Sequence, residues 1–219
     1  MSAFGGFSTD AMEFYRDLAA DPTKDFWLAN KSRYDASVRE PMEALVELLA
    51  PAFGEPKVFR PYRDVRFAKG ASPYKDHQGA FVEVASGIGW YLQLNAEGLM
   101  VSGGYHAHAA DQVQRLRAAV DDDVTGSELV AIIAAVAADG FAIWGRLMKT
   151  RPRGVAADHP RLELMRHQNL TAWREPGTPD WMFGAGAAKH VAAQWESLRP
   201  LVTWLARNVG PTTLERKRR

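Results

Sequence analysis

The chain has 219 residues, of which 47% are hydrophobic and 24% charged, and its formal net charge at pH 7 is +1. This composition excludes a disordered chain, and the nearly neutral balance excludes the global basic field of many nucleic-acid-binding domains. The absence of cysteine excludes disulfides, thiolate zinc sites and cysteine nucleophiles, and is typical of a reducing compartment. The chain start lacks signal-peptide features, and no apolar run reaches the ~18 residues of a membrane span, so we expect a soluble, cytoplasmic protein.

Helical patterns open the chain. Residues 8–20 begin with good N-cap residues and continue with apolar side chains at helical spacing. Residues 21–53 show the strongest helical period, with apolar side chains along one face. Pro41 lies inside that segment, and a proline within a helix removes one hydrogen bond at a cost of ~3 kcal/mol. We therefore predict a kink or a break near Arg39–Glu40.

The middle of the chain has the pattern of an antiparallel sheet. β-type sequence runs from about residue 57 to Tyr105, and AFVEV predicts one strand. The segments IGWYLQL and LMVSGGY flank NAEG, which predicts a hairpin with Gly98 in the left-handed conformation. Apolar and polar residues alternate along the first hairpin strand, so one face of the sheet should be covered.

Helical patterns of apolar residues return after this region. ADQVQRLRAAV and GSELVAIIAAVAA predict two helices, FAIWGRLMKT favours a strand, and DHPRLELMRHQNL predicts a helix with Pro160 in its first turn. A final helix is indicated by apolar residues at alternating steps of four and three, and Pro200 should bend it.

These patterns predict one α+β domain over residues 1–210. Its central antiparallel or mixed sheet should span about residues 57–105, with 141–149 as an additional candidate strand, and the N-terminal and C-terminal helices should pack on it. Residues 211–219 form a basic tail that we expect to be flexible.

One stretch, the basic segment (residues 60–77), differs from the rest. It carries five cationic residues, two aspartates, Asp64 and Asp76, and a turn sequence, KGASPYK. If the first part is a strand, alternation places Asp64 between two arginines, where it could fix a guanidinium whose remaining donors match a carboxylate or phosphate. We predict that the segment binds a phosphorylated or carboxylated small molecule through Arg60, Arg63, Arg66, Lys69, Tyr74 and Lys75.

Two alternatives remain open. The arginines could form structural ion pairs that join a loop to the sheet, since such networks resemble binding clusters. The segment could also belong to a nucleic-acid or protein interaction module, with arginines on phosphates and exposed aromatic rings on bases, although the nearly neutral chain disfavours nucleic acid. The sequence does not decide whether the protein is an enzyme.

The motif RDVRF followed by SPYK resembles the signature of a family of uncharacterised bacterial and fungal proteins, catalogued as a domain of unknown function. FGGFSTDAMEFYRDLAA, WLANKSRYDASVREPMEAL, GWYLQL, PRGVAADHPRLELMRH and LRPLVTWL are similar to the same family. The resemblance covers nearly the whole chain and implies a single α+β domain without an assigned activity or cofactor. Gly70 and Ala71 stand where relatives usually carry an acidic residue and a lysine, so a charge pair of the loop is missing here.

Other candidate sites are weaker. His106, His108 and Asp111 have the residue types of a metal site, but surface or capping histidines are the better interpretation, and we predict no metal. The pair Asp158–His159 favours a helix cap over an acid/base unit, and Glu83 favours solvent exposure over a general base. Three further basic residues could join the basic segment in space: Lys149, Arg151 and Arg153.

Motifs for phosphate loops, dinucleotide-binding folds, HExxH metalloproteases and α/β-hydrolases are all missing. We therefore disfavour these enzyme classes and predict no cofactor.

Overall fold

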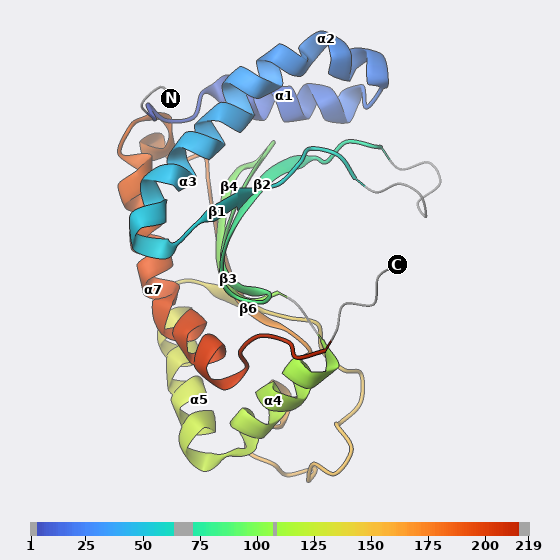
Figure 1. The fold of residues 1–219 in the computed structure, drawn as a ribbon, viewed down its shortest axis with the longest axis vertical. Helices are drawn as coiled ribbons and strands as arrows, with labels where there is room; N and C mark the ends of the chain where they lie inside the picture. Colours follow the sequence, from blue (N-terminus) through green and yellow to red (C-terminus); the bar gives the residue numbers. More distant parts are fainter. Residues whose placement is uncertain (1–3, 64–71, 107–108, 215–219) are drawn as a thin grey trace. The chain divides into compact units, whose positions relative to one another are not determined.

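The computed structural model describes residues 4–63, 72–106 and 109–214, and these have the α+β architecture that the sequence predicts. Within this part of the chain, an antiparallel sheet of six strands has the order β1-β2-β3-β4-β6-β5 (Figure 1). The register pairs Lys57 with Phe81 in β1–β2, and Ile143 with Ala172 in β5–β6. The strands are β1 (Pro56–Val58), β2 (His77–Ala85), β3 (Ile88–Asn95), β4 (Gly98–Tyr105), β5 (Ala142–Trp144) and β6 (Leu170–Gly177).

Helices precede and follow the first four strands. The α-helices are α1 (Thr9–Ala20), α2 (Lys24–Tyr34), α3 (Glu40–Phe53), α4 (Ala110–Asp121), α5 (Asp123–Ala138), α6 (Leu162–Met165) and α7 (Ala187–Asn208). A π-helix, η1 (Asp35–Arg39), joins α2 to α3, and a 3₁₀-helix, η2 (Asp180–Phe183), precedes α7. None of the described helices is long and apolar enough to cross a membrane.

The chain divides into two compact units. Unit 1 comprises residues 1–82, 91–101 and 175–194, and unit 2 comprises residues 83–90, 102–174 and 195–219. The division crosses strands β2, β3, β4 and β6 and helix α7, so each unit contains a part of these elements.

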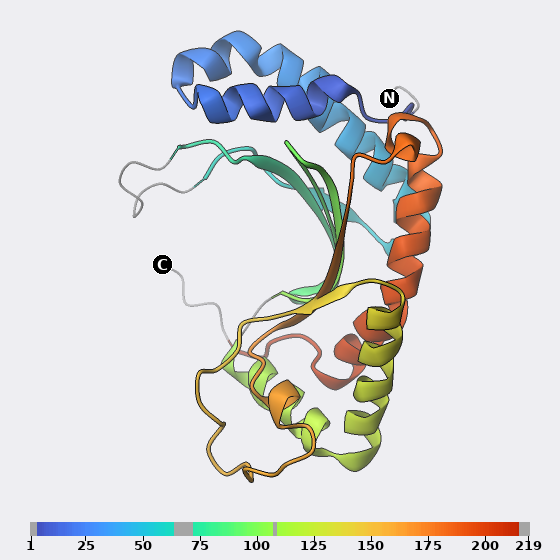
Figure 2. The same ribbon diagram turned by 180° about the vertical axis from the view of Figure 1, so that it is seen from behind.

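In unit 1, helices α1 and α2 lie side by side, joined by a short turn (Figures 1 and 2). Arg33 of α2 ties the pair together, because its guanidinium donates to Asp10 and Asp17 of α1, both at 2.7 Å. Beneath this polar link the aromatic rings pack. Trp27 lies 6.0 Å from Phe14 between ring centroids, and both side chains are buried.

Pro41 does not break the helix in which the sequence places it. The backbone stays right-handed helical through Arg39 and Glu40, but it widens to π-helix at Asp35–Arg39, directly before the proline. A proline ring clashes with the carbonyl four residues earlier, here that of Ser37, and a wider turn moves this carbonyl away from the ring. The irregularity therefore lies where the sequence predicts one, as a π turn and not as a break.

The hairpin of β3 and β4 follows its sequence pattern. Ile88, Trp90, Leu92 and Leu94 of β3 are all buried. Gly98 at the turn has φ +112°, and a Cβ there would lie 2.1 Å from the carbonyl oxygen of Gly177. Glycine is required at this position for its backbone conformation and for the close approach of the β6 end.

Unit 2 has its core between α4, α5 and the second part of α7. Asp122 caps α5 by accepting hydrogen bonds from the backbone N–H groups of Val124 and Thr125, at 3.1 and 2.8 Å. The indole of Trp204 in α7 donates to the carbonyl of Thr125 at 3.1 Å, which fixes α7 against the first turn of α5.

The prediction of a helix over DHPRLELMRHQNL is wrong for most of its length. Only Leu162–Met165 is helical, and the predicted helix ends where strand β6 begins, at Leu170. Leu170, Thr171 and Ala172 are buried in succession, so both faces of the strand are covered at its start, and burial does not follow the apolar–polar pattern of a half-buried strand. The predicted strand near 141–149 exists as β5, with an isolated bridge between Leu147 and His167 beyond it. The connection from β5 to α6 runs as a long loop (Figure 2).

Candidate functional site

The described part of the basic segment folds back on itself as a two-stranded ribbon, formed by residues 59–63 and 73–76. The N–H of Arg63 donates to the carbonyl of Pro73 at 2.8 Å, and the N–H of Lys75 donates to that of Pro61 at 2.7 Å. At the base of the ribbon, Gln78 donates to the carbonyl of Phe59 at 2.8 Å. This pairing brings residues that are ten or more positions apart in the sequence into direct contact.

The ribbon contains four of the six predicted ligand-binding residues: Arg60, Arg63, Tyr74 and Lys75. The other two, Arg66 and Lys69, lie outside the described residues, as does Asp64. Arg63 pairs with Asp76 through a 2.8 Å contact between its guanidinium and the carboxylate. The guanidinium of Arg60 is exposed and forms no ion pair with any described carboxylate.

Tyr74 is an anchor of the ribbon. Its side chain is only 6% exposed, and its ring stacks on that of Trp27 with centroids 4.5 Å apart and planes 12° apart. The ring of Tyr62 lies 5.7 Å from both of them. Burial, with a smaller effect from Tyr62, raises the pKa of the Tyr74 hydroxyl. Aromatic packing of this kind fixes the ribbon against α2, because offset and stacked rings contribute beyond their buried area.

A pocket of about 270 Å³ lies between the ribbon and the end of α1. Three of the predicted residues line it, namely Arg63, Tyr74 and Lys75, whereas Arg60 does not. All lining residues belong to unit 1. They are Tyr15, Leu18, Ala19 and Pro22 from α1 and the turn after it, and Arg63, Ser72, Tyr74, Lys75 and Asp76 from the basic segment.

Positive charge is concentrated at Lys75. Its pKa is lowered, first by burial and then by the nearby charges of Arg60 and Arg63. The ammonium lies 5.3 Å from the centroid of the Phe59 ring and forms no ion pair with a carboxylate in the described parts of the chain. A cation whose neighbours are cations is stabilised when an anion binds beside it.

Asp76 is held as a carboxylate. Burial alone would raise its pKa, but hydrogen bonds from His77, at 2.7 Å, and from Arg63 outweigh burial and lower it. Both partners contact the same carboxylate oxygen, Oδ1. Asp76 therefore orients Arg63 at the edge of the pocket and neutralises part of its charge.

Tyr15 is the buried polar group of the pocket. Its side chain is 3% exposed, and its hydroxyl makes no hydrogen bond to any residue that the structure describes. Burial, the nearby tyrosines and the charge of Asp76 raise the pKa of this hydroxyl well above its usual value. Tyr15 therefore stays protonated, and its neutral hydroxyl can act as a hydrogen-bond donor.

The wall formed by α1 was not recognised from the sequence. Tyr15 and Leu18 follow the helical period of core residues, and both are buried. They line a pocket only because the ribbon, which comes more than forty residues later in the chain, lies on the other side of it. Periodicity identifies a buried face of a helix, but it does not reveal which segment covers that face.

The chain was compared with models of protein families. A family model described as conserved hypothetical protein (DUF2461) matches residues 10–204. The chain belongs to the DUF2461 family. The sequence resemblance to an uncharacterised family is thus confirmed. No curated protein and no solved structure shows significant similarity to the chain.

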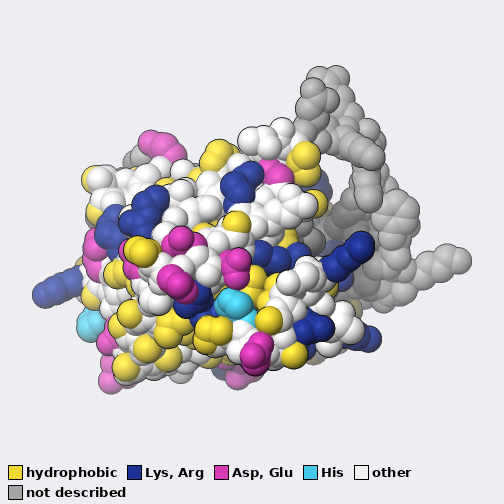
Figure 3. Space-filling model, turned by 90° about the horizontal axis from the view of Figure 1, so that it is seen from below, with side chains coloured by type: hydrophobic (Ala, Val, Ile, Leu, Met, Phe, Trp, Pro, Cys, Tyr) yellow, Lys and Arg dark blue, Asp and Glu magenta, His cyan; other side chains and the backbone are white. Residues whose placement is uncertain are grey.

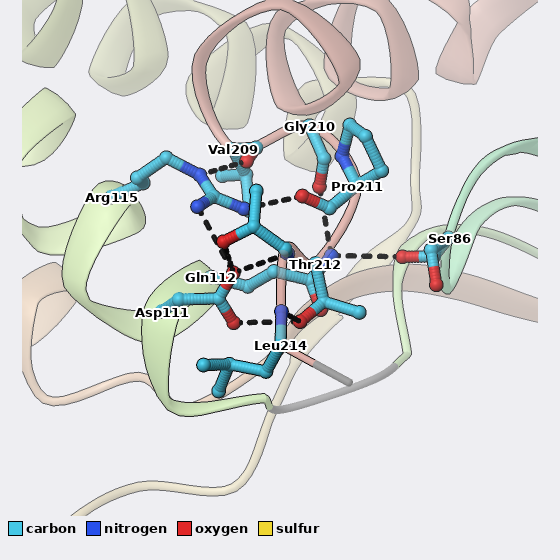
Figure 4. A network of polar contacts seen from close by, with 10 residues as sticks. Ser86, Asp111, Gln112, Arg115, Val209, Gly210, Pro211, Thr212 and Leu214 are labelled. Atoms are coloured by element: carbon cyan, nitrogen blue, oxygen red, sulfur yellow. Dashed lines mark hydrogen bonds and ion pairs between the residues drawn. The ribbon is translucent and has the colours of Figure 1, made fainter. Parts of the chain in front are cut away.

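In this DUF2461 chain the carboxylate of Asp111, one of the three residues considered for a metal site, binds other groups of the chain (Figure 4). Its carboxylate accepts from the Thr212 hydroxyl and the Thr213 N–H, both at 2.8 Å, and pairs with Arg115 at 3.1 Å. The hydrogen bond from the Thr213 N–H has the largest effect on the pKa of Asp111. Together these hydrogen bonds hold that pKa well below its usual range. Asp111 thus fastens residues 211–214, from the predicted tail, to the start of α4.

Other side chains of α4 also donate hydrogen bonds to the backbone that follows α7. Arg115 donates to the carbonyls of Val209 and Pro211, and Gln112 donates to those of Ser86 and Gly210, at 2.9 and 2.8 Å. His108 lies outside the described residues, and no group of three potential metal ligands exists among the residues described. Asp111 has a structural role in the geometry seen here.

The remaining candidates have local partners. Glu83 is exposed and accepts from the N–H of Gly87 at 2.9 Å. His159 contacts Asp121 at 3.1 Å and accepts from the N–H of Arg161, also at 3.1 Å. The three basic residues at 149, 151 and 153 belong to unit 2, whereas the ribbon belongs to unit 1.

Proposed function

We propose that this protein binds a small phosphorylated or carboxylated ligand in the pocket between α1 and the ribbon. The observation that carries the proposal is the state of Lys75. Its ammonium lines the pocket beside Arg63, has no carboxylate partner among the described residues, and has a pKa lowered by burial and by two neighbouring guanidiniums. Charge-assisted hydrogen bonds from such a group to an anion are roughly twice as strong as neutral ones.

Each polar group has a distinct role in this proposal. Lys75 supplies the main charge, and Arg63, oriented by Asp76, supplies further N–H donors. Tyr74 shapes the pocket with its ring, while Arg60 contributes a longer-range field from outside it. The sequence assigns Arg66 and Lys69 to the same site, and both lie outside the described residues. We place this activity in the cytoplasm, following the expectation from the sequence.

Isothermal titration calorimetry at low ionic strength tests the proposal, with inorganic phosphate and acetate as probes. Wild-type protein should bind at least one of them, and Lys75→Met should weaken that binding by about ten- to a hundredfold, because a hydrogen bond to a charged group contributes ~1.5–3 kcal/mol. Lys57→Met is the matched control, since Lys57 is an exposed lysine on β1 in the same unit. Equal affinities for wild type and Lys75→Met would reject Lys75 as the binding cation.

The 2.8 Å ion pair between Arg63 and Asp76 favours a second interpretation, in which the basic segment is purely structural. Arg63→Ala would then lower the melting temperature and leave anion binding unchanged. An exposed pair of this kind contributes only ~0–1 kcal/mol, so the two interpretations differ mainly in the binding assay.

Nucleic-acid binding receives less support. The formal net charge of the chain is only +1. On the single face seen in Figure 3, acidic side chains lie among the basic ones, so that face carries no basic patch. A nucleic-acid site would predict a steep fall of affinity with salt concentration. A gel-shift experiment at low salt with single-stranded and double-stranded DNA tests this alternative.

A further inference from the structure

The pocket beside the ribbon has two different walls. One wall is apolar and comes from the end of α1 and the following turn, with Leu18, Ala19 and Pro22. The ring of Tyr74, held by its stack on Trp27, also lines the pocket. A hydrated inorganic anion makes no use of such surfaces, whereas a ligand with an apolar body gains from each apolar area removed from water.

The polar wall carries one excess positive charge. Three ionised residues line the pocket in the described part of the chain, and Arg63 is already paired with Asp76, which leaves Lys75 uncompensated. A head group with a single negative charge balances this arrangement. A dianionic phosphate monoester would bring one negative charge more than these lining groups offset, and unpaired charge is costly where water is partly excluded.

The donors of the pocket suit a carboxylate. Lys75 supplies a charged donor, and Tyr15 supplies a neutral hydroxyl that has no other partner among the described residues. The Ser72 oxygen accepts from the N–H of Tyr74 at 3.1 Å, which leaves its own O–H proton available to a ligand. The two oxygens of a carboxylate accept several hydrogen bonds in its plane, so they can engage two or three such donors together.

The size of the pocket limits the body of the ligand. A volume of about 270 Å³ equals the liquid volume of roughly nine water molecules. It lies just below the ~300–1,000 Å³ of typical drug-sized sites. A carboxylate with one aromatic ring or a short aliphatic chain fits this volume.

We infer that the ligand is a small monocarboxylate with a short apolar body, its head on Lys75 and Tyr15 and its body on the α1 wall. This inference rests on the proposed anion-binding function and narrows it to one chemical class.

Isothermal titration calorimetry tests the proposed ligand class with four probes that differ in the charge of the head group and in the presence of an apolar body. Phenylacetate has both the head and the body, acetate has the head alone, phenyl phosphate has the body with a doubly charged head, and benzylamine has the body with a positive head. Phenylacetate should bind at least about tenfold more tightly than acetate, because its ring is buried on the apolar wall. It should also bind more tightly than phenyl phosphate, and benzylamine should not bind.

The outcomes separate the two levels of the proposal. If phenyl phosphate binds more tightly than phenylacetate, the monocarboxylate class is wrong while anion binding stands. If acetate equals phenylacetate, the apolar wall has no role and the inference is overturned. If neither these anions nor inorganic phosphate binds, the proposed function itself fails.

Two pairs of variants locate the ligand in the pocket. Ala19 is exposed on α1, so Ala19→Glu and Ala19→Gln should both fold, and they differ by one charge at nearly equal size. Ala19→Glu should weaken phenylacetate by about tenfold through like-charge repulsion, and Ala19→Gln by much less. Tyr15→Phe should weaken it by about tenfold through loss of the hydroxyl, whereas Tyr91→Phe, on the sheet and outside the pocket lining, should leave binding unchanged. Equal affinities of the Ala19 pair would place the ligand elsewhere.

Discussion

The hydroxyl of Tyr34 provides a sharp test of how the ribbon is supported. It donates to Oε1 of Gln78, and the two side chains are only 2% and 1% exposed. The amide of Gln78 in turn donates to the carbonyls of Phe59 and Gly79, at 2.8 and 2.9 Å. Tyr34→Phe keeps the ring in the aromatic core but leaves Oε1 of Gln78 buried without a partner.

A buried acceptor left unsatisfied costs ~1–3 kcal/mol, so we expect Tyr34→Phe to lower the free energy of unfolding by about 2 kcal/mol. For a chain of this length, each kcal/mol corresponds to ~2–4 °C in melting temperature, which gives a decrease of roughly 4–8 °C. Tyr15→Phe is the matched control. It removes a hydroxyl from the same aromatic core, but from a residue whose hydroxyl has no hydrogen-bond partner among the described residues.

Urea unfolding followed by tryptophan fluorescence measures both variants, since the ring of Trp27 lies 5.0 Å from that of Tyr34. We expect Tyr15→Phe to stay within about 0.5 kcal/mol of wild type. Equal free energies of unfolding for the two variants would refute the reasoning, because it would show that Gln78 gains nothing from its tyrosine partner.

Three further predictions concern the hairpin, the C-terminal segment and a partly buried histidine. Gly98→Ala should lower the melting temperature by several degrees, since any Cβ would meet the Gly177 carbonyl at 2.1 Å; a melt within about 1 °C of wild type would contradict this. The pKa of Asp111 is lowered in the fold, so its contribution is complete above its usual pKa of 3.8 and is lost as the pH falls below it. Asp111→Asn should therefore accelerate proteolysis of the C-terminal segment at pH 7, and the difference from wild type should start to shrink only below pH 3.8, as the pH falls toward the lowered pKa of Asp111. Burial lowers the pKa of His106 to about 4 from 6.5, so the unfolded state gains protons first as the pH falls. Stability should drop by about 2 kcal/mol between pH 7.5 and 5, and this drop should be absent in His106→Gln when both are measured by urea unfolding.

Local patterns predicted much of the fold because their causes are local. Helices α1, α4, α5 and α7 follow from apolar residues at helical spacing and from caps such as Asp122. The β3–β4 hairpin follows from alternation and from a glycine that adopts positive φ. In each case the residues that decide the conformation lie within one or two turns of one another.

Strand β6 shows where such patterns fail. Its first three residues are buried in succession, and it lies between β4 and β5 in the sheet. A strand covered on both faces has no alternating pattern, and the preceding LELM run has helical spacing, so local reasoning extends the helix. The partners that make this segment a strand are more than twenty-five residues away in the sequence.

The candidate site divides in the same way. The sequence alone determined that cationic side chains gather in residues 60–77 and that a turn lies among them, because charge and turn chemistry are properties of the residues themselves. Only the tertiary structure decided that Tyr74 supports the ribbon from the core, that Arg63 is paired with Asp76, and that α1 closes the pocket. Pairing, burial and cavity shape depend on which distant surfaces meet in the folded chain, and a one-dimensional pattern does not contain that information.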